Sequence, residues 1–481
     1  MEKEPKKLSL GGLSAIVLGT MIGAGIYDIA RTMAAGASPG GVLLSWLVAG
    51  IGMMFLVLTF KILADGRPDL DAGIYQYAQQ VAGNYVGFNI AWGYWLSVTV
   101  SLVALAVMLN DSMGAFFPVF LTHGWPTLLF GLLLIWIMCA VVMRGVNVTA
   151  HLNTAMTVLK FVMLIFVVVV LIIYARIGAM SVDLWGRAAH LGSLGRQIHS
   201  DMMVALWCFI GVEGAVMMSS RARRPADVGK AGMIGFVLAL ILYVLVSVLC
   251  FGIMSQSELA ALPDPSIAYV LKAVCGDWAY YFVIISVIVS LTGCWTAWTL
   301  VCAQTPYGAA SVKIMPAQFL RMSPKNVPHF ALIASCLFMT LFMVLVYFSH
   351  SLFMAAVDLT GVMVLPAYFF SALFLIRFAL TERSRTRLSR SRTMYMLFIG
   401  SAGTVFTVYM MWAAGWRLLL MSGVFYLIGT YFYIQARRQH FPEAGRTFKA
   451  IMSPGDRCIF ALLCAASLAT IILIALGYSP F

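Results

Sequence analysis

Charged residues are scarce in this chain: Asp, Glu, Lys and Arg make up 10% of its 481 residues, whereas 62% are hydrophobic. An ordinary soluble domain has about 25% charged residues. A soluble core of this length could not bury so much apolar surface with so few charges to cover the outside. The scarcity of charge excludes an ordinary soluble protein and predicts that lipid solvates most of the apolar side chains.

Motifs of catalytic and metal sites are also missing. None of the nine cysteines belongs to a C-x-x-C pair, most of them lie in apolar segments, and the seven histidines are scattered. The sequence contains no H-E-x-x-H, G-x-S-x-G or P-loop motif, which disfavours an enzyme and excludes a primary pump. A channel would need a filter motif or a ring-forming repeat, and neither is present. We expect no catalytic residue, no metal ligand and no cofactor.

Long apolar runs are what the sequence has instead. About thirteen segments approach the roughly 20 residues that cross a bilayer. Because lipid offers backbone groups no hydrogen-bond partner, segments of this length are predicted to be helices. The expected spans lie near residues 11–34, 41–64, 84–109, 126–146, 153–175, 200–220, 231–255, 278–304, 329–349, 352–376, 394–413, 416–435 and 458–478.

The charges that are present are unevenly placed. The net charge of +13 comes largely from three loops, near residues 221–230, 377–392 and 437–457, which the order of spans puts on one side of the membrane. Such asymmetry is typical of cytoplasmic loops, so it predicts a multi-pass protein of the bacterial inner membrane with a cytoplasmic N-terminus, and no nucleic-acid partner. One loop conflicts with this pattern, because residues 176–199 carry three arginines on the expected outer side.

Glycines interrupt two of the expected spans, five spans apart. The first span contains three glycines within residues 19–25, and the sixth contains two within residues 209–215, beside Glu213. Close helix packing is the simpler explanation, because small residues let backbones approach. Paired broken helices also mark the substrate site of inverted-repeat transporters, where half-helix N-termini face an anion and free carbonyls face a cation. An α-amino acid fits those two poles.

Several short motifs are spread along the first ten spans. They are Gly23-Ala24-Gly25-Ile26, Arg67-Pro68-Asp69-Leu70-Asp71-Ala72-Gly73-Ile74-Tyr75, Gly93-Tyr94-Trp95, Leu206 to Ala215, Asp227-Val228-Gly229-Lys230, and Trp298-Thr299 with Gln304-Thr305. Together they resemble the motifs of the amino acid/polyamine/organocation transporters. The similarity is greatest to the basic amino acid/polyamine antiporter branch, especially its arginine/ornithine antiporters.

This resemblance implies an all-α polytopic membrane protein with a LeuT-like 5+5 inverted repeat. Helices 1 and 6 would be discontinuous, and two to three peripheral helices would follow the repeats. The implied division is a cytoplasmic N-terminus at 1–10, helices 1–5 at 11–178, an external loop at 179–199, helices 6–10 at 200–377, and a basic loop with helices 11–13 at 378–481.

The resemblance also implies a substrate site. Family position assigns the substrate carboxylate to the glycine motif of the first span, and the ammonium to carbonyl oxygens beside both breaks. Two aromatic residues would close gates, and a third would stack on the substrate side chain. The residues are Gly23, Ala24 and Gly25 for the carboxylate motif; Met21, Trp207 and Ile210 for the carbonyls; Tyr94 and Trp207 for the gates; and Trp298 for stacking.

Four positions depart from the family pattern and concern the substrate more than the fold. Ala24 replaces a serine, and Leu102 stands where relatives often have asparagine. Asp28 and Arg31 replace uncharged residues; their i, i+3 spacing favours an ion pair on one helix face. Asp28 could alternatively meet a cationic substrate, as could Asp358 in the tenth span.

Two further ionisable residues lie inside apolar spans, where charges are costly and usually functional. Glu213 could act in gating or proton coupling, or it could be a buried acid that braces the broken backbone. Lys160 could extend its ammonium to the membrane surface. It could alternatively replace a bound sodium between the first and fifth spans, as a lysine does in some proton-coupled relatives. The tryptophans of the predicted site have a similar alternative, since most membrane tryptophans are interface anchors.

The resulting prediction is a secondary antiporter that works by alternating access. It would exchange an amino acid, such as arginine, ornithine or lysine, for a related amino acid or its decarboxylated amine. The alternative is a proton-coupled permease for a neutral, acidic or histidine-like substrate. The expected partners are the two substrates and the lipid bilayer, with a homodimer as a further hypothesis.

Overall fold

The computed structural model describes residues 7–23, 25–122, 124–348, 350–384, 388–442 and 448–476. These residues form helices and connecting turns, with one isolated bridge between Leu8 and Ala222 and no strand among them. The all-α prediction is therefore confirmed. Ala24 lies outside the described residues, as does the side chain of Asp358.

Twelve of the helical stretches are long and apolar enough to cross a membrane, and a bent helix pair brings the number to thirteen. These thirteen stretches coincide with the predicted spans. The spanning helices are α1 (Leu10–Met21) with α2 (Gly25–Ala34), α3 (Pro39–Gly66), α5 (Asn84–Gly114), α6 (Trp125–Met143), α7 (Val146–Tyr174), α9 (Leu194–Phe209) with α10 (Gly214–Met217), α11 (Pro225–Leu249), α14 (Asp277–Ser311), α15 (His329–Phe348), α16 (His350–Ser384), α17 (Arg390–Ala414), α18 (Trp416–His440) and α20 (Pro454–Ala475).

Shorter helices lie between the spans. They are α4 (Ile74–Ala82), α8 (Ile177–Ser181), α12 (Gln256–Ala260), α13 (Ser266–Cys275) and α19 (Phe448–Ile451). Of these, α12 and α13 pack against α2, and α4 packs against α5 and α16. The broken first span is thus covered at its α2 end by the two short helices that precede α14.

The first and sixth spans are discontinuous, as predicted. Helix α1 ends at Met21, and α2 begins at Gly25 with a bend of 43° between their axes. Helix α9 ends at Phe209, and Gly211 takes a φ of +110°, which ends the helical path before α10. Such a backbone angle favours glycine, because a side chain would clash with the neighbouring carbonyl.

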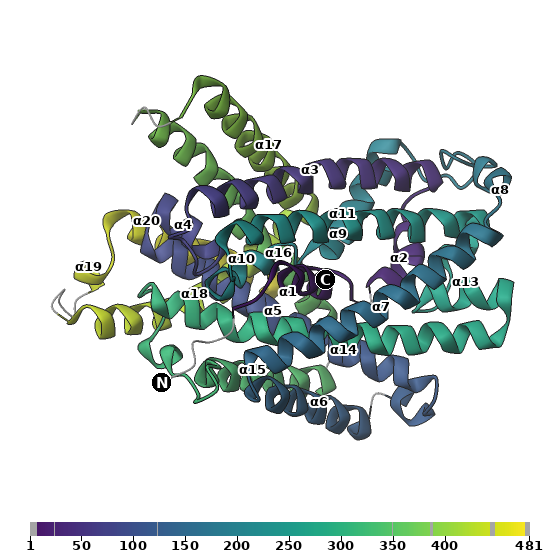
Figure 1. The fold of residues 1–481 in the computed structure, drawn as a ribbon, viewed down its shortest axis with the longest axis horizontal. Helices are drawn as coiled ribbons and strands as arrows, with labels where there is room; N and C mark the ends of the chain where they lie inside the picture. Colours follow the sequence, from purple (N-terminus) through teal and green to yellow (C-terminus); the bar gives the residue numbers. More distant parts are fainter. Residues whose placement is uncertain are drawn as a thin grey trace.

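Helix α1 lies at the centre of the bundle, with α11, α7 and α14 packed around it (Figure 1). Burial separates the core spans from the outer ones: 94% of the most apolar stretch of α5 is buried, against 17% of that of α20. The two breaks are therefore held at the most buried part of the fold.

Substitution of Gly211 tests whether the break in the sixth span is needed. A Cβ added there would lie 2.8 Å from Cβ and Oγ1 of Thr20 in α1. Gly211→Ala should therefore lose about 1–2 kcal/mol to the left-handed backbone and a further ~1–3 kcal/mol to overpacking. The apparent Tm of the detergent-solubilised protein measures this loss.

Gly83 provides the matched control, because its φ of +89° is equally left-handed but an added Cβ would meet nothing within 4 Å. Gly83→Ala should lose only the backbone component. Equal losses in the two variants would show that contact between the broken spans is unimportant for stability.

Candidate functional site

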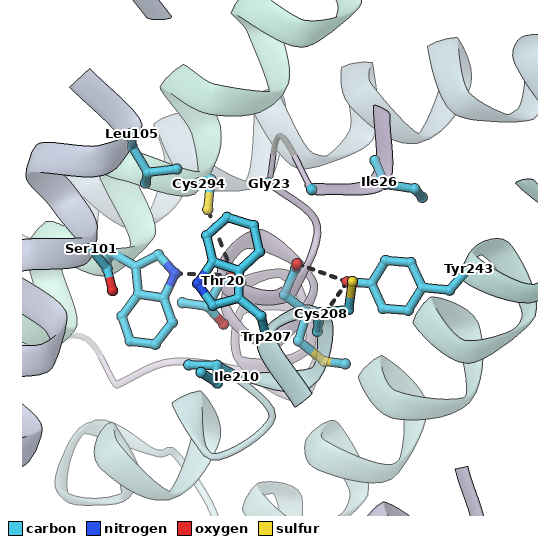
Figure 2. Close-up of a pocket in the computed structure, with 13 residues that line it drawn as sticks. Thr20, Gly23, Ile26, Ser101, Leu105, Trp207, Cys208, Ile210, Tyr243 and Cys294 are labelled. Atoms are coloured by element: carbon cyan, nitrogen blue, oxygen red, sulfur yellow. Dashed lines mark hydrogen bonds between the residues drawn. The ribbon is translucent and has the colours of Figure 1, made fainter. Parts of the chain in front are cut away.

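A cavity with a volume of 50 Å³ lies where the two broken spans meet α5, α11 and α14 (Figure 2). It is large enough for a few water molecules. An amino acid with a long side chain needs more space, so its binding requires the walls to move apart. Six predicted site residues line the cavity: Met21, Gly23, Gly25, Trp207, Ile210 and Trp298.

The carbonyl oxygens at the end of α1 form one pole of the cavity. The last carbonyls of any helix lack intrahelical partners, and in a membrane interior they need other donors. Protein side chains supply them. The Tyr243 hydroxyl of α11 lies 2.8 Å from the carbonyl oxygens of both Met21 and Cys208, which links the two broken spans. The Trp298 indole donates to Thr20 O at 3.0 Å. Because a carbonyl oxygen has two lone pairs, Met21 can still accept a hydrogen bond from a ligand.

Lys160 of α7 reaches the same carbonyl cluster from the other side. Its Nζ donates to Gly19 O at 3.1 Å and to Ile22 O at 2.5 Å, and its side chain is buried. The lysine therefore does not extend to the membrane surface. Its ammonium occupies a position between the first and fifth spans where carbonyl oxygens face a cation.

The N-terminus of α2 forms the opposite pole. Gly25 begins this ten-residue helix, and both Gly25 and Ile26 line the cavity. The first N–H groups of a helix have no intrahelical acceptor, and the helix dipole adds a partial positive charge at that end. An anion such as a carboxylate is favoured there. The Trp207 ring packs closely on Gly25, since a Cβ added to Gly25 would lie 2.9 Å from ring atom Cζ3.

The wall between the poles is aromatic and weakly polar. Trp207 and Trp298 supply aromatic surfaces, and both line the cavity rather than lying at a membrane interface. Ser101 and Leu105 of α5 face the cavity one turn apart, whereas Leu102 is fully buried elsewhere. The position where relatives often carry asparagine therefore does not line the cavity in this state.

Glu213 and Tyr94 do not line the cavity but meet beside the second break. The Tyr94 hydroxyl of α5 donates to Glu213 Oε1 at 2.7 Å, and the Tyr368 hydroxyl of α16 donates to Oε2 at 2.6 Å. The N–H of Gly211 also donates to Oε2 at 3.1 Å. All of these groups are buried. The carboxylate thus connects α5 and α16 to the broken backbone, as expected for an acid that braces the break.

Asp28 lies on α2 away from the cavity lining. It pairs with Arg31, whose Nε donates to Asp28 Oδ1 at 2.9 Å and whose Nη2 contacts Oδ2. The predicted i, i+3 ion pair is confirmed. This arrangement does not test whether Asp28 contacts a substrate, so that role stays a prediction.

Several residues of the site carry no sequence signal of their own. Tyr243 and Tyr368 are single tyrosines within apolar spans, a pattern that also fits interface anchors. Cys208 and Cys294 line the cavity, with Cys294 Sγ 3.6 Å from Thr20 O, although cysteines in apolar spans are usually packing residues (Figure 2). Cys208 and Cys294 lie close to Gly211 and Gly293, which is their one sequence signal, whereas Tyr243 and Tyr368 have none. Among the described residues there is no cluster of three or more side chains that could hold a metal ion.

The sequence model of the amino acid permease family matches residues 8–437. Among curated proteins, the arginine/agmatine antiporter of Chlamydia trachomatis serovar L2 is 38% identical over 458 residues, covering 94% of each chain. The arginine/agmatine antiporter of Chlamydia caviae is 37% identical over 468 residues, covering 96% of each chain. That of Chlamydia pneumoniae is 36% identical over 444 residues, covering 91% of each chain.

Similarity of this extent along almost the whole chain agrees with the broken spans, the two poles and the helical bundle. The resemblance noted from the motifs is thereby confirmed. This chain belongs to the amino acid permease family, and it is a multi-pass membrane transporter of amino acids, not an enzyme.

Proposed function

We propose that the amino acid antiport carried out by this chain is the exchange of a basic amino acid, arginine, for its decarboxylated amine, agmatine. One observation carries the proposal: the cavity joins a helix N-terminus, a carbonyl cluster and the Trp298 ring within one small space. The N-terminus suits a carboxylate, the carbonyls suit an ammonium, and the ring suits a guanidinium. The names of the relatives support the same substrate pair.

The roles of the site residues are part of this proposal. Gly23, Ala24 and Gly25 provide the backbone for the carboxylate, while the carbonyls of Met21, Trp207 and Ile210 receive the ammonium. Trp298 stacks on the guanidinium, and Trp207 closes the cavity over Gly25. Glu213 holds Tyr94 and Tyr368 in a closed arrangement, and Lys160 occupies the cation position beside α1.

Orientation and assembly complete the proposal. We infer an inner-membrane location with the N-terminus in the cytoplasm, supported by Leu8, which pairs with the backbone of the basic loop at Arg221 and Arg223. The division into repeats at 11–178 and 200–377 is supported by breaks five spans apart. Lipid surrounds the exposed faces of the outer helices, and a second copy of the chain can associate with those same faces.

Exchange in proteoliposomes tests the substrate pair. Labelled arginine should enter only when the vesicles contain arginine or agmatine, because an antiporter needs substrate on both sides. A panel of unlabelled amino acids and amines on the outside should show competition by basic compounds alone. Uptake into empty vesicles driven by a pH gradient would instead identify a proton-coupled permease. Exchange driven by neutral or acidic compounds but not by basic ones would refute the basic substrate.

Substitution of Trp298 tests the aromatic contact. Trp298→Leu removes the ring, so the Kd for arginine should rise about two- to thirtyfold, whereas Trp298→Phe should keep part of the affinity. Equilibrium binding to purified protein measures both. Trp295→Phe is the control, because Trp295 is buried in the same helix but does not line the cavity. An unchanged Kd in Trp298→Leu would remove this residue from the site.

Lys160 tests the proposed cation position. Transport by the unmodified protein should run equally well in sodium and choline salts, because the lysine ammonium takes the place of sodium. Lys160→Met removes the ammonium from the Gly19 and Ile22 carbonyls, and only Ile22 keeps a second donor, the Ser290 hydroxyl at 3.3 Å, so exchange should fall roughly tenfold or more. Rates in the two salts, measured for both proteins, check these outcomes. An absolute sodium requirement in the unmodified protein would contradict the assignment.

A further inference from the structure

We propose that the Asp28–Arg31 ion pair sets the relative affinity of the site for an amino acid and its decarboxylated amine. The inference rests on the proposed arginine/agmatine exchange. It concerns a different property, the discrimination between the two substrates. They differ in one group, the carboxylate, and that group is assigned to the N-terminus of α2, where this pair lies.

The position of Asp28 is electrostatically unusual for such a site. Asp28 is the fourth residue of α2, and the helix rise of 1.5 Å per residue puts its Cα about 5 Å along the axis from Gly25. Side chains on a helix also tilt toward its N-terminus. A negative charge there cancels the favourable field of the helix end and repels a substrate carboxylate.

Arg31 offsets that charge. Its guanidinium bonds both carboxylate oxygens of Asp28, and the Asp28 side chain is only 7% exposed. Water and salt screen a buried charge weakly, so an unpaired Asp28 would act on a ligand within roughly 10 Å. Arg31 therefore preserves the anion pole of the cavity while remaining outside it.

The surrounding contacts hold the pair in place. The N–H of Ser266, the first residue of α13, donates to Asp28 Oδ1 at 3.3 Å. The Ser266 hydroxyl accepts from the N–H of Arg31 at 3.3 Å. A neighbouring carboxylate, Asp264, also interacts with both Arg31 and Asp28, and it stays beside the pair in every variant. The pair is thus a fixed part of the wall behind the α2 N-terminus.

Opposite substitutions separate this electrostatic role from a structural one. Arg31→Gln leaves Asp28 unpaired and should weaken arginine relative to agmatine. Asp28→Asn removes the carboxylate that is hydrogen-bonded to Arg31, so the site becomes more positive and should bind agmatine more weakly relative to arginine. Both variants break the same ion pair, so a merely structural role would change the two ratios in the same direction.

The measurement is displacement of labelled arginine from purified protein by unlabelled arginine and agmatine. The ratio of the two Kd values should shift about five- to fifteenfold in opposite directions in the two variants. The double variant Asp28→Asn/Arg31→Gln should return toward the unmodified ratio, and Arg31→Lys should retain it. Lys272→Gln is the matched control, since it breaks an exposed pair with Asp277 and should leave the ratio unchanged.

Two outcomes would overturn the inference. Ratios unchanged in both single variants, or shifted in the same direction, would show that the pair only supports the packing of α2 on α13. If the unmodified protein binds neither arginine nor agmatine, the proposed function is wrong, and this inference fails with it. If the unmodified protein binds both ligands but the Kd ratio is the same in the variants, only this inference is refuted and the proposed function stands.

Discussion

The carbonyl groups at the end of α1, which have no partner within their own helix, are the constraint on which the rest of the site depends. A helix that stops inside a membrane leaves four carbonyl oxygens without partners, and lipid cannot supply them. In this protein, side chains from three other spans donate hydrogen bonds to these carbonyls: Lys160 from α7, Tyr243 from α11 and Trp298 from α14. Two of these spans, α11 and α14, also line the cavity, so they both support the break and shape the site.

The hydrogen bonds that stabilise the break are therefore also linked to ligand binding. Two of the donors, Tyr243 and Trp298, also line the space where an ammonium would bind, so a ligand meets carbonyls that are already oriented and partly occupied. The second break is attached to the first through Tyr243, whose hydroxyl contacts carbonyls of both α1 and α9, and through the Thr20 hydroxyl at 3.0 Å from Gly211 O. The two half-helix ends cannot shift independently without losing these contacts. A site that must open and close is thus built so that both breaks respond together.

Local patterns predicted much of this arrangement. Apolar run lengths located all thirteen spans, the glycine clusters located both breaks, and i, i+3 spacing paired Asp28 with Arg31. Contacts between distant spans could not be predicted in this way. Tyr243 is separated from Met21 by more than two hundred residues, and nothing in its own span distinguishes a donor to a broken helix from an interface anchor. The sequence also could not predict which face of α5 points toward the cavity: Ser101 lines it and the adjacent Leu102 does not.

The buried charges around the site are each compensated locally. Glu213 is held by two tyrosine hydroxyls and a backbone N–H, and Lys160 by two carbonyl oxygens. Asp201 of α9 is buried as well, and its carboxylate interacts with the Ser45 side chain. The two substrates of the proposed exchange, arginine and agmatine, differ by one unit of charge. Exchange of a singly charged amino acid for its doubly charged amine would therefore respond to the membrane potential.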